Sequence, residues 1–62
     1  MDDRIMALLE EKARLFGTRM IPVTHQEIAG EIGSPREAVS RVLKKLEKEG
    51  AVRLFRGKIQ LV

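Results

Sequence analysis

Two short helical patterns meet at Gly33-Ser34, and this close junction constrains the fold more than any other feature of the chain. The first pattern begins at Thr24, because Thr24 and Glu27 have the spacing of a capping box, in which a hydroxyl and a carboxylate each satisfy a backbone amide. It ends at Gly33, since glycine accepts the left-handed conformation that closes many helices. Only a residue or two remains for the connection, so the two helices must pack against each other.

The second helix is expected over about residues 35–49. Ser34 is predicted as its cap, Pro35 as its first residue and Glu37 as the partner of Ser34 in a second capping box. Apolar residues recur at helical spacing along one face: Val39, Val42, Leu43 and Leu46. Charged residues occupy the opposite face: Glu37, Arg41, Lys44 and Lys48. Gly50 is expected to end this helix.

A third helix is expected at the start of the chain, where Asp2 and Asp3 favour a helix N-terminus and Gly17 ends the pattern. Its apolar residues fill an arc of about half the circumference: Ile5, Leu8, Leu9, Ala13, Leu15 and Phe16. Lys12 points into the middle of this arc. Either its ammonium reaches water past a buried stem, or part of this face meets a partner outside the chain.

The remaining residues predict extended structure. Ile21 and Val23 suit a short extended segment, because Pro22 prevents the helix from continuing. Residues 51–55 and 58–62 alternate apolar with polar around Arg56-Gly57, as the strands of a hairpin do. The sequence therefore predicts one domain over residues 1–62, mostly α with a small β hairpin.

Charge is divided unequally along the chain. Residues 1–33 carry a net charge of −2, whereas residues 34–62 carry +5. The second half is therefore a candidate surface for a polyanion, and the alternative is a solvated lysine-rich helix followed by a charged sheet edge. No apolar run approaches the ~20 residues of a membrane-spanning helix, and no signal-peptide layout is present, so we expect a cytoplasmic protein without membrane contact.

The residue types present, and their spacing, give little support to catalysis or metal binding. The chain has no cysteine, and His25 is its only histidine, so neither a metal site nor a general base with a nucleophile is indicated. Two acidic pairs, Glu10 with Glu11 and Glu27 with Glu31, fall on faces expected to be exposed. We therefore expect neither an enzyme nor a bound cofactor.

The junction has the spacing of a helix-turn-helix, whose second helix enters the major groove of DNA. Ala29 allows close approach, Gly33 supplies the turn, and Val39 packs the second helix onto the first. These residues resemble the winged helix-turn-helix domain of the cyclic-AMP receptor and fumarate/nitrate reductase regulator (Crp/Fnr) family. The resemblance rests on residues 24–29, Gly33, residues 36–43, Leu46 and Gly50, and is most specific at Arg36-Glu37-Ala38-Val39-Ser40-Arg41.

The resemblance implies a three-helix winged helix-turn-helix domain of a bacterial transcription regulator that binds double-stranded DNA sequence-specifically. It implies that Glu37, Ser40 and Arg41 read base edges, while Arg36 reads a base or grips a phosphate. The chemistry agrees: Arg41 suits guanine O6 and N7, Glu37 accepts from cytosine N4, and Ser40 suits a thymine or adenine edge. The capping box with Ser34 is the alternative explanation of Glu37. Ser40 beside Arg41 resembles the branch of the family that reads TTGA-like half-sites.

Contacts to the DNA backbone are expected from three regions: the start of the first motif helix, the lysines of the second, and the hairpin, or wing, over about residues 51–62. The residues are Thr24, His25, Gln26, Lys44, Lys45, Arg56 and Lys58. Each has a simpler alternative. His25 could be an exposed helix-start residue, the lysines could serve solubility, and the hairpin charges could protect a sheet edge.

Members of that family carry an N-terminal β-barrel sensor domain and a long dimerisation helix, and neither lies within these 62 residues. The resemblance implies two-fold dimers on inverted repeats, with the first helix or the missing portion as the route to a homodimer. Two other functions remain open. One is a winged helix that contacts an acidic protein, and the other is a nucleic-acid binder without sequence preference.

Overall fold

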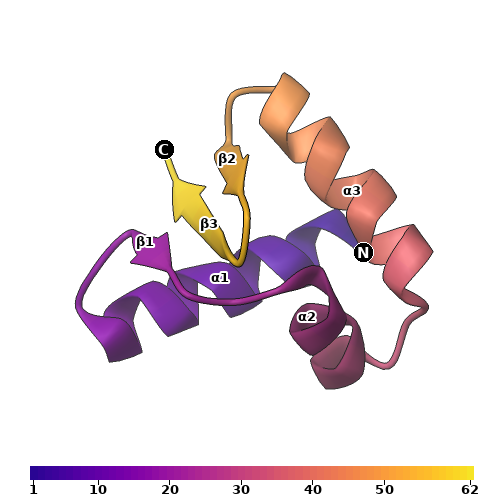
Figure 1. Cartoon of the computed structure of the whole chain (residues 1–62), viewed down its shortest axis with the longest axis horizontal. Helices are drawn as coiled ribbons and strands as arrows, with labels where there is room; N and C mark the ends of the chain where they lie inside the picture. The colour runs from indigo at the N-terminus through magenta and orange to yellow at the C-terminus, as the bar shows by residue number, and fades with distance from the viewer.

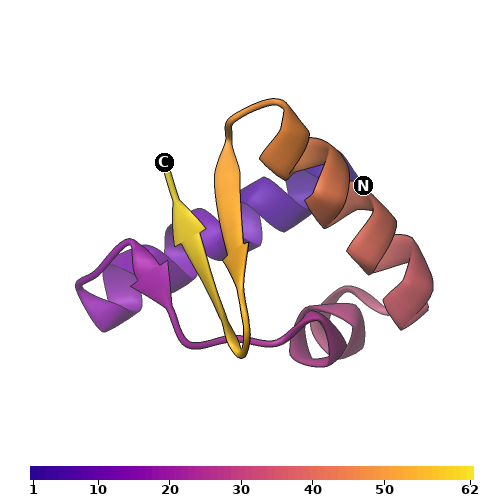
Figure 2. The same ribbon diagram turned by 45° about the horizontal axis from the view of Figure 1, so that its top comes forward.

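A computed structural model describes all 62 residues as three helices and one antiparallel sheet (Figure 1). The elements are α1 (Asp2–Phe16), β1 (Met20–Ile21), α2 (His25–Ile32), α3 (Arg36–Lys48), β2 (Val52–Phe55) and β3 (Lys58–Leu61). Figures 1 and 2 show α1 running the length of the molecule, with the sheet beside one part of it and α2 and α3 at the other end. The predicted winged helix-turn-helix fold is confirmed.

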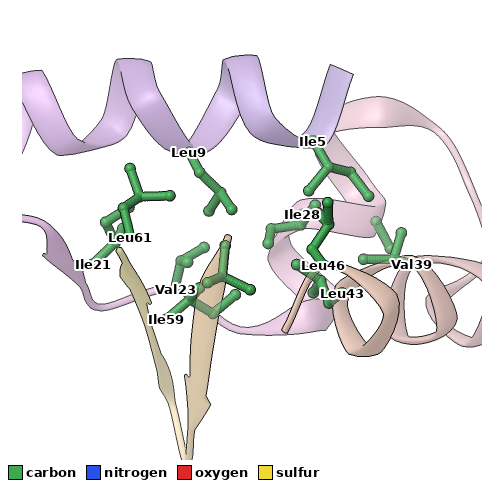
Figure 3. Close-up of a cluster of buried hydrophobic side chains, with 12 residues drawn as sticks. Ile5, Leu9, Ile21, Val23, Ile28, Val39, Leu43, Leu46, Ile59 and Leu61 are labelled. Atoms are coloured by element: carbon green, nitrogen blue, oxygen red, sulfur yellow. The ribbon is translucent and has the colours of Figure 1, made fainter. Parts of the chain in front are cut away.

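The core contains only apolar side chains and draws on every element. No polar or charged residue is buried. In Figure 3, Ile5 and Leu9 of α1 point toward Ile28 of α2, Leu43 of α3 and Ile59 of the hairpin. The buried residues are Ile5, Leu9, Ile21, Val23, Ile28, Ala29, Val39, Leu43, Leu46, Val52, Ile59 and Leu61. Burying this apolar surface is the main force that holds the helices to the sheet.

Helix α1 uses less of its apolar arc than its periodicity predicts. Leu15 is 77% exposed and Phe16 is 53% exposed, because the last turn of α1 extends past the core (Figure 1). Lys12 forms an ion pair with Glu31 of α2, because its Nζ lies 2.9 Å from the Glu31 carboxylate. Gly17 closes the helix as predicted, in the left-handed conformation. No helix of the protein is both long and apolar enough to cross a membrane.

The junction between α2 and α3 confirms one predicted capping box and corrects the other. Thr24 accepts a hydrogen bond from the Glu27 amide at 3.1 Å, and the Glu27 carboxylate accepts one from the Thr24 amide at 2.9 Å. The box between Ser34 and Glu37 does not form. Pro35 is the N-cap of α3, and no side chain caps this helix.

The reason lies in how α2 ends. Gly33 has a φ of 70°, and the amides of Gly33 and Ser34 both donate to the carbonyl of Ala29. Ser34 therefore belongs to the closure of α2. Pro35 also favours an extended conformation at Ser34, the residue that precedes it. Helix α3 begins one residue later than predicted, so Glu37 is its second residue and not the third, the position a capping box needs.

The hairpin forms as predicted, but the sheet has one strand more. Phe55 pairs with Lys58 across the Arg56-Gly57 turn, where Gly57 has a φ of 73°. The strand order is β1-β3-β2. The predicted extended segment supplies β1 in part: Ile21 pairs with Ile59, whereas Val23 lies beyond the end of the strand. This pairing fixes the end of α1 to the hairpin and so holds the wing beside α2 and α3.

Candidate nucleic-acid interface

The outward face of α3 gathers the four predicted base-reading residues. They line one open depression together with Lys44, and no apolar residue takes part: Arg36, Glu37, Ser40, Arg41 and Lys44. Because Val39 and Leu43 are fully buried on the opposite face, helical periodicity turns these polar side chains outward. All of them are exposed except Ser40, which is half-buried.

A second polar depression adjoins the first. It is lined by the start of α2, the first residue of α3 and the hairpin turn: Thr24, His25, Gln26, Arg36, Arg56 and Gly57. Arg36 lines both depressions, so they form one continuous surface, which we call the polar surface. Three segments far apart in the sequence meet there, and Figure 2 shows the hairpin turn beside the connection that leads from β1 into α2.

Positive charge predominates on the polar surface. Arg36, Arg41, Lys44 and Arg56 are opposed by a single carboxylate, that of Glu37. Since these groups are solvent-exposed, their field is screened by salt over about 10 Å at ~0.1 M. The surface thus offers several guanidinium and ammonium groups to a polyanion. No cluster of three potential metal-ligating side chains occurs in the chain.

His25 makes a contact that sequence reasoning missed. Its Nδ1 lies 2.8 Å from the Ser40 hydroxyl, which joins the start of α2 to the middle of α3. Burial lowers the pKa of His25 below its ordinary value, and repulsion from Arg36 and Lys44 lowers it further. The two residues are fifteen positions apart and no local pattern relates them, so the sequence carried no signal for this pair.

Glu37 has no structural partner. Its side chain is exposed and takes part in neither a hydrogen bond nor an ion pair. The predicted capping box with Ser34 is absent. A carboxylate in the middle of a basic surface weakens attraction to any polyanion. The stability of α3 therefore explains the position of Glu37 only through the small favourable effect of a negative charge near a helix N-terminus.

Two of the predicted backbone contacts lie outside the polar surface. Lys45 points toward α1, where its Nζ is 3.0 Å from the Asp2 carboxylate. This hydrogen bond raises the pKa of Lys45 and lowers that of Asp2. Lys58 is exposed at the start of β3, immediately after the hairpin turn, and lines neither depression. The other five residues lie on the surface: Thr24, His25, Gln26, Lys44 and Arg56.

Known proteins share both the sequence and the geometry of this chain. The model of the Crp-like helix-turn-helix domain matches residues 3–62. The transcriptional regulator SdrP of Thermus thermophilus is 44% identical over 46 residues, which cover 74% of this chain and 23% of SdrP. A solved protein of the Crp/Fnr family from Eubacterium rectale superposes with a TM-score of 0.95 at 39% identity, over 98% of this chain and 28% of that protein.

A second solved structure, a Crp/Fnr-family transcriptional regulator from Thermus thermophilus, superposes with a TM-score of 0.89 at 34% identity. The match covers 100% of this chain and 35% of that protein. This chain therefore spans between 23% and 35% of the length of these three relatives.

Proposed function

The chain belongs to the Crp-like helix-turn-helix family, and from this membership we propose that it binds double-stranded DNA sequence-specifically as part of a transcription regulator. The observation that carries the proposal is the polar surface. It brings the four predicted base-reading residues onto the exposed face of α3, beside the start of α2 and the wing turn. A family of transcription regulators also gives no reason to expect an enzyme.

In the proposed complex α3 lies in the major groove. Its 13 residues make a rod of about 20 Å, and a B-DNA major groove of about 12 Å admits an α-helix. Arg41 would form paired hydrogen bonds with guanine, Glu37 would accept from cytosine N4, and Ser40 would contact a thymine or adenine edge. Arg36, shared by both depressions, would reach either a base or a phosphate.

Phosphates would lie against the second depression. Backbone amides at the start of α2 attract anions, and Thr24, His25 and Gln26 surround that helix end. Arg56 approaches the same hollow from the hairpin, so α2 and the wing would hold one stretch of backbone between them. Lys58 would meet the backbone next to the turn, whereas Lys45 would first have to leave Asp2.

The composition of the surface favours DNA over a protein partner. The buried centre of a protein interface is rich in apolar and aromatic residues. Neither depression contains one, and the two phenylalanines of the chain, Phe16 and Phe55, lie elsewhere. Glu37 favours base reading over binding without sequence preference, because a carboxylate only weakens non-specific attraction to phosphates.

Two copies would occupy the two halves of an inverted repeat, with half-sites about 34 Å apart. The exposed end of α1, with Leu15 and Phe16, is the surface on which a second copy or a further portion of the protein would pack. Within this proposal, one domain bound to one half-site gives weak affinity, and pairing of two copies adds to it through effective concentration.

Selection of preferred sites from random duplexes, followed by titration at several salt concentrations, tests the proposed function. We expect affinity for every duplex to fall with salt, while the ratio between the selected and a random duplex remains well above one. Arg14→Gln removes an exposed charge from α1, away from the polar surface, and serves as the control. Equal affinity for selected and random duplexes would contradict sequence-specific binding.

A further inference from the structure

Ser40 is the only one of the four proposed base-reading residues whose polar group is held by another side chain. Its hydroxyl lies 2.8 Å from Nδ1 of His25, whereas Arg36, Glu37 and Arg41 have free side chains. A hydroxyl has one hydrogen to donate and lone pairs to accept with. What Ser40 offers to a base therefore depends on whether its hydrogen is already given to the imidazole.

The second ring nitrogen of His25 is open to the surroundings. Nε2 has no hydrogen-bond partner in the chain, and no unpartnered side-chain nitrogen is buried, so Nε2 reaches solvent. His25 lines the depression in which the proposed function places a phosphate. Because a phosphate accepts hydrogen bonds and does not donate them, Nε2 keeps its hydrogen in such a complex. The proton on Nδ1 is then the only variable.

We propose that His25 determines whether Ser40 presents a donor or an acceptor to a base, so that protonation of the imidazole changes the base that Ser40 selects. With a neutral ring, Ser40 donates its hydrogen to Nδ1 and offers a base only lone pairs. With a charged ring, Nδ1 carries a hydrogen and donates it to Ser40, whose own hydrogen is then free for a base. His25 is thus a positioning residue, and this inference rests on the proposed function.

The groups around His25 make this change dependent on bound DNA. In the free protein the cations facing it are Arg36 and Lys44 from α3 and Arg56 from the wing. On its own helix Glu27 is engaged with Thr24. Burial, and after it the charges of Arg36 and Lys44, favour the neutral ring. A phosphate in the depression opposes all three cations and favours the charged ring, so binding of DNA takes up a proton.

The consequence for specificity is a base preference that changes with pH. Thymine presents an acceptor, O4, at the place where cytosine presents a donor, the N4 amino group. A charged His25 therefore favours thymine at the base that faces Ser40, and a neutral His25 favours cytosine. Lowering the pH shifts the preference toward thymine.

Two duplexes test this inference. The base pair facing Ser40 is identified as the one at which Ser40→Ala loses discrimination, and duplexes with thymine or cytosine there are compared from about pH 5.5 to about pH 8.5. We expect the thymine-to-cytosine affinity ratio to rise on acidification by about two- to tenfold, the value of one hydrogen bond. His25→Asn keeps an amide beside Ser40 without a titrating group, so its ratio should not change with pH.

Proton uptake gives an independent measurement on the unmodified chain. His25 is the only histidine, so its imidazole resonances are unambiguous in an NMR titration. We expect its pKa to lie below about 6.5 in the free protein and to rise when duplex is added. Calorimetry in two buffers of different ionisation enthalpy should show uptake of up to about one proton near that pKa.

The outcomes separate this inference from the proposed function. Sequence-specific binding with a pH-independent ratio, or with a pH dependence that persists in His25→Asn, overturns the role of His25 and leaves the proposed function standing. An imidazole whose pKa does not rise with duplex overturns it too. Absence of sequence preference at every pH overturns both.

Discussion

Glu37 allows base reading to be separated from stability, because the structure removes its expected structural role. The perturbation is Glu37→Ala. The side chain is exposed and unpartnered, so the only stabilising effect lost is its charge near the N-terminus of α3. That effect is about 0.3–1 kcal/mol. Since alanine also has the higher helix propensity, the free energy of unfolding should fall by less than about 1 kcal/mol.

The effect on DNA recognition has a different sign for different duplexes. A contact that reads a base is worth about 1–3 kcal/mol, and one carboxylate accepting from one cytosine amino group lies at the lower end. Glu37→Ala should therefore reduce discrimination at one cytosine-containing base pair by about 1 kcal/mol, roughly fivefold. Affinity for random duplexes should not fall, and should rise slightly, because a charge that repels phosphates has gone.

Fluorescence anisotropy with the selected duplex and its single-pair variants measures the discrimination, and urea denaturation measures the stability. Glu10→Ala is the matched control, since it removes an exposed carboxylate from α1 on another part of the molecule. A stability loss above about 2 kcal/mol would mean that Glu37 stabilises α3 in a way the structure does not show. Unchanged discrimination at every base pair would refute its role as a base reader.

Three further predictions follow from the same contacts. Arg41→Ala should cost about 1–3 kcal/mol on the selected duplex and flatten discrimination, whereas Lys58→Ala should weaken all duplexes alike; equal losses of Arg41→Ala on selected and random DNA would count against base reading. Thr24→Ala should destabilise the fold by about 1 kcal/mol, while Ser34→Ala should change stability by under about 0.5 kcal/mol, as measured by thermal unfolding. Folding lowers the pKa of His25, so the unfolded chain takes up the proton first as the pH falls. The free energy of unfolding therefore keeps its full value above about pH 6.5 and declines as the pH falls through the folded pKa. His25→Asn should lack this part of the decline, as measured by urea midpoints.

Local signals located most elements because the forces that start and stop a helix act within one turn. The capping box at Thr24, the closing glycines Gly17 and Gly33, and the hairpin turn at Arg56-Gly57 are all confirmed. The helix start that was wrong, at Ser34, is the place where two local signals compete for the same residue. Closure of α2 uses the Ser34 amide, and α3 has to begin later.

The sequence by itself determined the order of the helices and strands, the apolar face of α3 and the gathering of positive charge after Gly33, because each depends on residue type and on spacings of a few positions. Tertiary structure alone decided the contacts between distant residues: Ser40 with His25, Lys12 with Glu31, Lys45 with Asp2, and β1 with β3. Such pairs form only when packing of the core fixes the angle and separation of two elements. The sequence therefore named the charged and polar side chains of the polar surface together with two that lie outside it, Lys45 and Lys58. The fold determined which of these side chains touch, and it left Glu37 without a partner.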